Sequence, residues 1–160
     1  MSDPVTRMNE AVPKFATEIA PASHTPAAHS GATGRVAIDL EQLATNWQNL
    51  ARHVARAECG AVVKANAYGL GAAHVIPALW RAGCRTFFIA TPQEAAEARR
   101  LAPEATLFAL DGLLPDAAEA FAEHSVTPVL STLAGVEAWA RLGATGGRRL
   151  PAALHIDSGL

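Results

Sequence analysis

Apolar residues along the chain fall into two alternating patterns. Short runs that are apolar at almost every position, typical of buried strands, cover residues 59–65, 84–90, 105–110, 126–130 and 150–157. An opening run at residues 35–40 alternates apolar and polar positions and predicts one more strand. The segments between these runs predict helices over residues 40–54, 72–83, 91–101, 115–124 and 131–143.

Capping residues mark the ends of several of these helices. Thr91 as cap and Glu94 three residues later form a capping box, which makes the following helix the most clearly marked in the chain. Asp39 and Ser131 are predicted caps for two others, and Gly83 predicts a helix end. Strand and helix signals therefore follow each other in regular order.

This alternation favours an α/β protein in which helices cover a parallel sheet. A doubly wound open sheet and a closed (β/α)8 barrel share the pattern, and periodicity does not separate them. No GxGxxG or P-loop follows a predicted strand, which disfavours a nucleotide-binding open sheet. A barrel typically takes about 250 residues. If the fold is a barrel, these residues hold only part of one.

Composition narrows the domain organisation. Residues 1–34 are rich in Ala, Pro, Ser, Thr and His and show no sustained period, so we expect a flexible leader there and the folded α/β portion over residues 35–160. The net charge of −2 and the few aromatic residues disfavour nucleic acid as a partner. No apolar run approaches the roughly 18 residues that a membrane span requires.

The cysteines and histidines bear on the cellular compartment and on metal binding. The two cysteines, Cys59 and Cys84, form neither a CxxC pair nor a disulfide framework, which suits a reducing compartment. His53, His74 and His124 have no partner at metal-ligand spacing, so we expect no metal site. A cytoplasmic location without a membrane partner is the resulting expectation.

Lys64 is the strongest candidate for a functional residue. It is one of only two lysines, and it follows the apolar run at residues 61–63, where desolvation penalises its charge. The carboxyl end of a buried strand is also where α/β proteins assemble their sites. A lysine that must be neutral for Schiff-base chemistry fits this position. An ordinary ion pair with Asp39 or Asp157 fits it as well, and spacing alone leaves both open.

The loop after Lys64 adds further groups. Gly69 and Gly71 permit tight turns and close approach by a ligand, and Tyr68 places a phenol four residues from the amine. Taken alone, Tyr68 is equally consistent with a packed loop aromatic.

The whole stretch from residue 61 to 71, AVVKANAYGLG, closely resembles the pyridoxal-phosphate attachment motif of the alanine racemases, which are fold-type III enzymes. The likeness extends to RVAIDLEQLATNWQNL, GCRTFFIATPQEAAEAR and LHIDSGL, so it runs over residues 35–160. The resemblance implies that residues 35–160 are the N-terminal portion of a TIM-type (β/α)8 barrel, a partial barrel with a first strand and about five barrel strands. The family's C-terminal β domain would lie outside these residues.

The resemblance implies a cofactor, a reaction and an assembly. Lys64 would hold pyridoxal 5'-phosphate as an internal aldimine and act as one of two bases, and Tyr68 would bind the phosphate. The reaction would interconvert L-alanine and D-alanine in a homodimer whose partner subunit supplies a tyrosine as second base. Supply of D-alanine for peptidoglycan precursors and alanine catabolism both stay open as its role, as does serine as a further substrate. The 160 residues alone are expected to be inactive. The alternatives are a non-catalytic pyridoxal-phosphate-binding barrel of the cofactor-homeostasis type and an inactive truncated product.

Overall fold

A computed structural model describes residues 36–54, 56–114 and 116–159 of the chain. The predicted leader at residues 1–34 lies outside the described residues. The chain divides into two units, Met1–Val36 and Ala37–Leu160, and the second carries all the elements discussed below.

Strands and helices alternate along the second unit. The strands are β1 (Ala61–Val62), β2 (Thr86–Ile89), β3 (Thr106–Ala109), β4 (Val126–Leu130) and β5 (Ala153–Leu154). The helices are α2 (Leu40–Val54), α4 (Ala72–Ala82), α5 (Pro92–Leu101), α6 (Ala118–Glu123) and α7 (Leu133–Thr145), and a short helical turn, α3 (Lys64–Tyr68), follows β1. These elements confirm the predicted alternation, with strands shorter than the apolar runs that predicted them.

The strand order decides between the two architectures that the sequence leaves open. The sheet has five strands, all neighbouring pairs are parallel, and the spatial order β1-β2-β3-β4-β5 repeats the chain order. A doubly wound sheet reverses its order at a switch point, whereas a barrel adds each strand beside the last. The predicted partial barrel is therefore confirmed.

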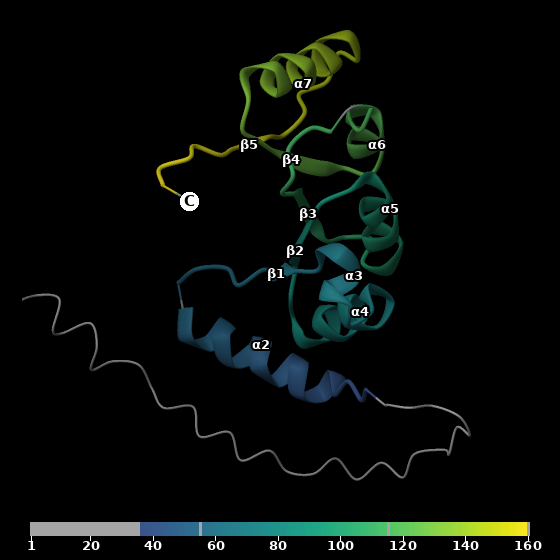
Figure 1. The fold of residues 1–160 in the computed structure, drawn as a ribbon, viewed down its shortest axis with the longest axis vertical. Coiled ribbons are helices and arrows are strands. Elements are labelled where there is room, and N and C mark those ends of the chain that lie inside the picture. Colours follow the sequence, from purple (N-terminus) through teal and green to yellow (C-terminus); the bar gives the residue numbers. More distant parts are fainter. Residues whose placement is uncertain (1–35, 55, 115, 160) are drawn as a thin grey trace, which may run out of the picture. The chain divides into compact units, whose positions relative to one another are not determined.

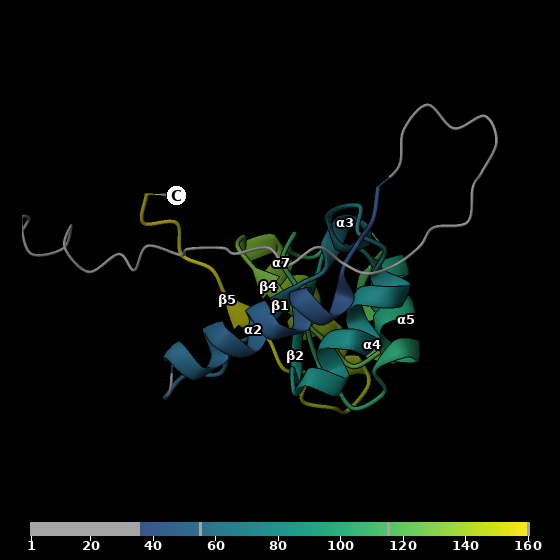
Figure 2. The ribbon, with the colours of Figure 1, turned by 90° about the horizontal axis from the view of Figure 1, so that it is seen from below.

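Helices cover one face of this sheet. Figure 1 shows α4, α5 and α6 along one side of the strands, and Figure 2 shows α2 beside α4. Side chains on the covered face, including Phe87, Leu107 and Val126, are buried. On the other face Phe88 and Phe108 are only half-buried, and their rings stack with centroids 5.4 Å apart. The helix-covered face therefore holds the core.

The predicted helix ends are confirmed at most positions. Thr91 and Glu94 form both hydrogen bonds of the capping box, and the Asp39 carboxylate accepts from the Gln42 amide at 2.9 Å. Gly83 ends α4 in the left-handed conformation. The cap of α7 is Thr132, not Ser131 as predicted, because the Thr132 hydroxyl accepts from the Gly135 amide at 3.1 Å.

The predicted opening strand at residues 35–40 is wrong. Residues 36–39 belong to no strand, and Leu40 already begins α2. A strand needs a neighbour for its backbone amides and carbonyls. Within the described residues no strand pairs with this segment, so its alternating pattern cannot produce a ladder.

Candidate active site

Lys64 stands where β1 leaves the sheet. Val63, the residue before it, is 2% exposed, and its amide donates to the Phe88 carbonyl of the neighbouring strand at 2.9 Å. The chain turns away from the sheet directly after this last ladder bond. Lys64 is thus anchored by a buried strand end, as its place after an apolar run predicts.

The following turn is left-handed. Ala65, Asn66 and Ala67 have φ of 51–54° and ψ of 47–48°, and Tyr68 has φ of 54°. Left-handed backbone costs roughly 1–2 kcal/mol for each non-glycine residue. The sequence predicted a turn made flexible by Gly69 and Gly71, but the structure has a strained and specific one.

Local hydrogen bonds offset part of this strain. The Ala67 amide donates to the Val63 carbonyl at 2.8 Å. Asn66, a residue type that tolerates the left-handed region, accepts from the Ala72 amide at 2.8 Å through its side chain. That bond pairs the first amide of α4, so the turn is fixed to the helix that follows it.

The Lys64 amine reaches toward the end of β3. Its Nζ lies 3.4 Å from Oδ1 of Asp111, and the two side chains are 32% and 48% exposed. An exposed pair of this kind contributes at most about 1 kcal/mol to stability. The sequence named Asp39 and Asp157 as possible partners. Asp39 instead caps α2, and the partner found, Asp111, was missed although it follows a predicted strand.

Tyr68 points its ring outward. The residue is 64% exposed, which argues against the packed-aromatic alternative. Within the described residues its hydroxyl makes no hydrogen bond, so the phenol is open to a ligand.

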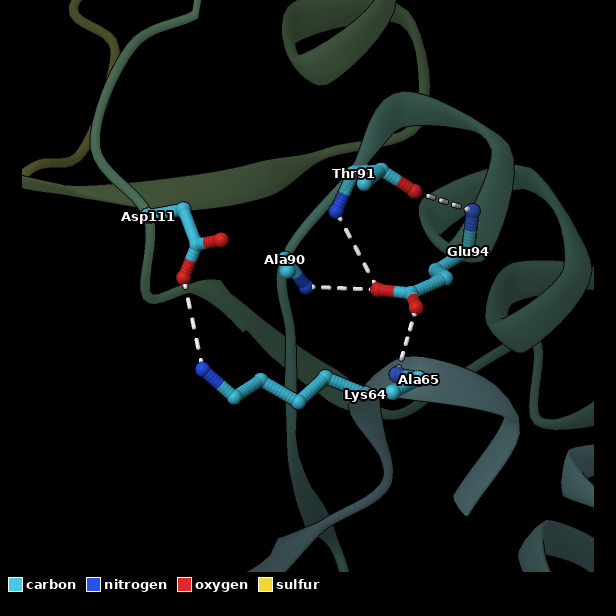
Figure 3. A network of polar contacts seen from close by, with 6 residues as sticks. All are labelled: Lys64, Ala65, Ala90, Thr91, Glu94 and Asp111. Carbon is cyan, nitrogen blue, oxygen red and sulfur yellow. Dashed lines mark hydrogen bonds and ion pairs between the residues drawn. The ribbon is translucent and has the colours of Figure 1, made fainter. Parts of the chain in front are cut away.

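Glu94 links the Lys64 turn to the neighbouring strand end. Its carboxylate accepts from the Ala65 amide at 2.7 Å and from the Ala90 amide at 2.8 Å (Figure 3). The capping box signalled Glu94 as a cap, but nothing in the sequence signalled the contact with Ala65. The carboxyl edge of the sheet thus gathers the Lys64 amine, the Asp111 carboxylate and the Glu94 contacts.

Two further expectations can be compared with the described residues. Residues 36–54, 56–114 and 116–159 contain no group of three or more His, Cys, Asp or Glu side chains able to hold a metal ion. Within the same ranges, no helix combines the length and the apolar character needed to cross a bilayer.

The fold and the site define a class of protein. Sequential parallel strands with a lysine at their carboxyl edge make this an α/β domain of the TIM-barrel type. The sequence profile of the family described as "Alanine racemase, N-terminal domain" matches residues 38–160. The chain therefore belongs to that family, which confirms the resemblance carried by AVVKANAYGLG.

Relatives of known identity agree with this assignment. The chain is 50% identical over 126 residues to the alanine racemase of Methylobacterium sp. (strain 4-46), covering 79% of this chain and 35% of that protein. It is 45% identical over 130 residues to the alanine racemase of Brucella ovis, covering 81% and 33%. The chain thus spans about a third of the length of these relatives.

Solved structures give the same result for the fold. The alanine racemase from Bartonella henselae, whose crystal structure contains covalently bound pyridoxal phosphate, matches with a TM-score of 0.74 and 40% identity. The match covers 77% of this chain and 36% of that one. A histidine racemase from Leuconostoc mesenteroides matches with a TM-score of 0.68 at 28% identity.

Proposed function

We propose that this protein interconverts L-alanine and D-alanine with pyridoxal 5'-phosphate held at Lys64. The observation that supports the proposal most directly is the Lys64 amine at the carboxyl edge of the sheet, in a chain of the alanine racemase N-terminal family. Identity of 45–50% to proteins named alanine racemase favours alanine as substrate. The relatives named above are racemases and lend no support to a non-catalytic cofactor-homeostasis barrel.

The residues present suit this cofactor. A cofactor aldehyde needs a primary amine that it can reach, and the Lys64 side chain is 32% exposed beside an orienting carboxylate. A phosphate needs hydrogen-bond donors, and the exposed phenol of Tyr68 is one, a turn away from Lys64 along the backbone. Bound pyridoxal phosphate supplies a ring that withdraws electrons from the substrate's α-carbon.

The protein's part in the reaction is proton transfer. Inversion requires a proton to leave one face of the α-carbon and another to arrive at the opposite face. We assign Lys64 Nζ to one face, with Asp111 Oδ1, 3.4 Å away, to orient it. Tyr68 is the only tyrosine of the 160 residues and is assigned to the phosphate. The second base is therefore proposed to come from outside residues 1–160, from the partner subunit of a homodimer.

The proposed biological setting is the cytoplasm, where D-alanine would be supplied for peptidoglycan precursors. The gene should then relieve the D-alanine requirement of a bacterial strain that lacks its own alanine racemases. Growth that still depends on added D-alanine would contradict this role.

The reaction is tested on the full-length gene product incubated with pyridoxal phosphate. Borohydride reduction followed by peptide mapping should place the cofactor's mass on Lys64 and leave Lys14, the other lysine of these 160 residues, unmodified. L-alanine in heavy water should racemise with deuterium at the α-carbon. Absence of attachment at Lys64 would contradict the proposal, and racemase activity in residues 1–160 alone would contradict the external second base.

A further inference from the structure

Glu94 joins two strand ends at the carboxyl edge of the sheet. Its Oε1 accepts from the Ala65 amide at 2.7 Å, and its Oε2 accepts from the amides of Ala90 at 2.8 Å and Thr91 at 3.2 Å. Ala65 lies in the turn after β1, whereas Ala90 and Thr91 follow β2. One side chain therefore ties the turn that carries Lys64 to the start of α5.

These contacts exceed what helix capping requires. In a capping box the third helical residue bonds back to the cap amide, and Glu94 and Thr91 form that pair. The bond to Ala65 lies outside the motif and spans 29 residues of sequence. Three amide donors converge on a side chain that only accepts, which suits a carboxylate. A glutamine has a single accepting oxygen and cannot serve both sides.

The Ala65 amide belongs to the strained part of the backbone. Ala65, Asn66 and Ala67 adopt the left-handed conformation, which non-glycine residues disfavour. Such a conformation persists only where surrounding contacts hold it. Because Ala65 is exposed, its amide would otherwise bond to water. The contact with Glu94 fixes the peptide that joins Lys64 to Ala65, and thereby the direction in which Lys64 leaves the backbone.

We propose that Glu94 is a positioning residue, which holds the left-handed turn so that Lys64 and Tyr68 are arranged to receive the cofactor. This inference rests on the function proposed above. Figure 3 shows the Glu94 carboxylate directed at the Ala65 amide, while the Lys64 side chain extends toward Asp111. Glu94 thus acts through the backbone and not on the amine itself.

The decisive variant is Glu94→Gln in the full-length gene product. Its one accepting oxygen can keep the cap of α5 but then loses the bond to Ala65. We expect the affinity for pyridoxal phosphate to fall by at least about tenfold, with slower borohydride trapping at Lys64. Thr91→Ala is the matched control, since it removes the acceptor for the Glu94 amide and leaves the Glu94 carboxylate in place. It should lower thermal stability while cofactor affinity stays within about twofold.

Amide hydrogen exchange in the cofactor-free protein tests the contact without a variant. The Ala65 amide of the wild type should be protected because Glu94 is its acceptor, and this protection should be lost in Glu94→Gln. Glu97→Gln, on the same helix, is a second control, since Glu97 makes no side-chain hydrogen bond within the described residues. It should leave exchange and cofactor affinity unchanged.

Each outcome is informative. An unprotected Ala65 amide in the wild type overturns the inference even if Glu94→Gln fails to fold. Unchanged cofactor affinity in folded Glu94→Gln, or an equal loss in Thr91→Ala, also overturns it. If the wild type itself attaches no cofactor at Lys64, the proposed function fails instead. The amide-exchange result then still reports separately on whether Glu94 holds the turn.

Discussion

Each end of helix α5 places a charged side chain against backbone groups of neighbouring loops. At the first turn, the Glu94 carboxylate accepts from the amides of Ala65, Ala90 and Thr91. At the last turn, the Arg99 guanidinium donates to four carbonyls, those of Pro103, Ala105, His124 and Ser125. An acid at a helix N-terminus and a base at its C-terminus also match the helix dipole.

These similar interactions serve different purposes. Glu94 lies at the carboxyl edge of the sheet and contacts the strained turn that carries Lys64. Arg99 lies at the amino edge, where it joins the segments that lead into β3 and β4, and burial lowers the pKa of its guanidinium. In barrel-type proteins the carboxyl edge carries chemistry and the amino edge carries stability. The position of Glu94 or Arg99 within the helix does not reveal its role. The role depends on which loop the side chain contacts.

The largest expected effect is functional and lies at the carboxyl edge. Lys64→Arg should abolish borohydride-stable attachment of pyridoxal phosphate at this position and lower racemisation by at least about a thousandfold, since no primary amine remains at the site. The unfolding free energy should change by less than about 1 kcal/mol, because the pair with Asp111 is exposed. Lys14→Arg is the matched control and should retain attachment. Attachment that survives in Lys64→Arg would refute the assignment.

At the amino edge the effect should be on stability alone. Arg99→Ala removes the donor of four hydrogen bonds and should lower the unfolding free energy by about 3 kcal/mol. Arg100→Ala, at the next and exposed position, should cost less than about 0.5 kcal/mol. Urea unfolding measures both. Equal losses in the two variants, or weaker cofactor affinity in folded Arg99→Ala, would break the division between the edges.

The amino edge should also respond to alkaline pH. Burial raises the pKa of the Cys84 thiol from 9.0 to about 11. The unfolded chain then loses this proton first, so stability is retained below pH 9 and falls between pH 9 and 11. The loss should reach roughly 2 kcal/mol by the upper end of that range. Cys84→Ala should lack this component in urea unfolding, and an identical pH slope in both proteins would contradict it.

The smallest expected effect is on stability and concerns Asn66, in the left-handed turn at the carboxyl edge. Asn66→Ala loses the bond to the Ala72 amide and the tolerance of asparagine for the left-handed region, which should cost about 1–2 kcal/mol. Asn66→Gly keeps the backbone freedom and should be less destabilised than Asn66→Ala. Thermal unfolding ranks the two variants. If alanine proves as stable as asparagine, the turn is not strained in solution.

Sequence reasoning could recover features that depend on neighbouring residues. The helix and strand periods, the capping box at Thr91 and Glu94, and the placing of Lys64 at a strand end were all correct. It failed for the opening strand at residues 35–40, where an alternating pattern has no partner strand. Choosing Ser131 over Thr132 as a cap failed for a smaller reason, because both residue types can cap a helix.

The sequence by itself determined the α/β class, the family and the lysine to examine, because periodicity, capping and a short motif are written in consecutive residues. Tertiary structure alone decided the barrel order of the strands, the pairing of Lys64 with Asp111 across 47 residues and the contact of Glu94 with Ala65 across 29. These contacts depend on which strand ends lie next to each other at the carboxyl edge. Tertiary packing determines that neighbourhood, and no local sequence pattern encodes it.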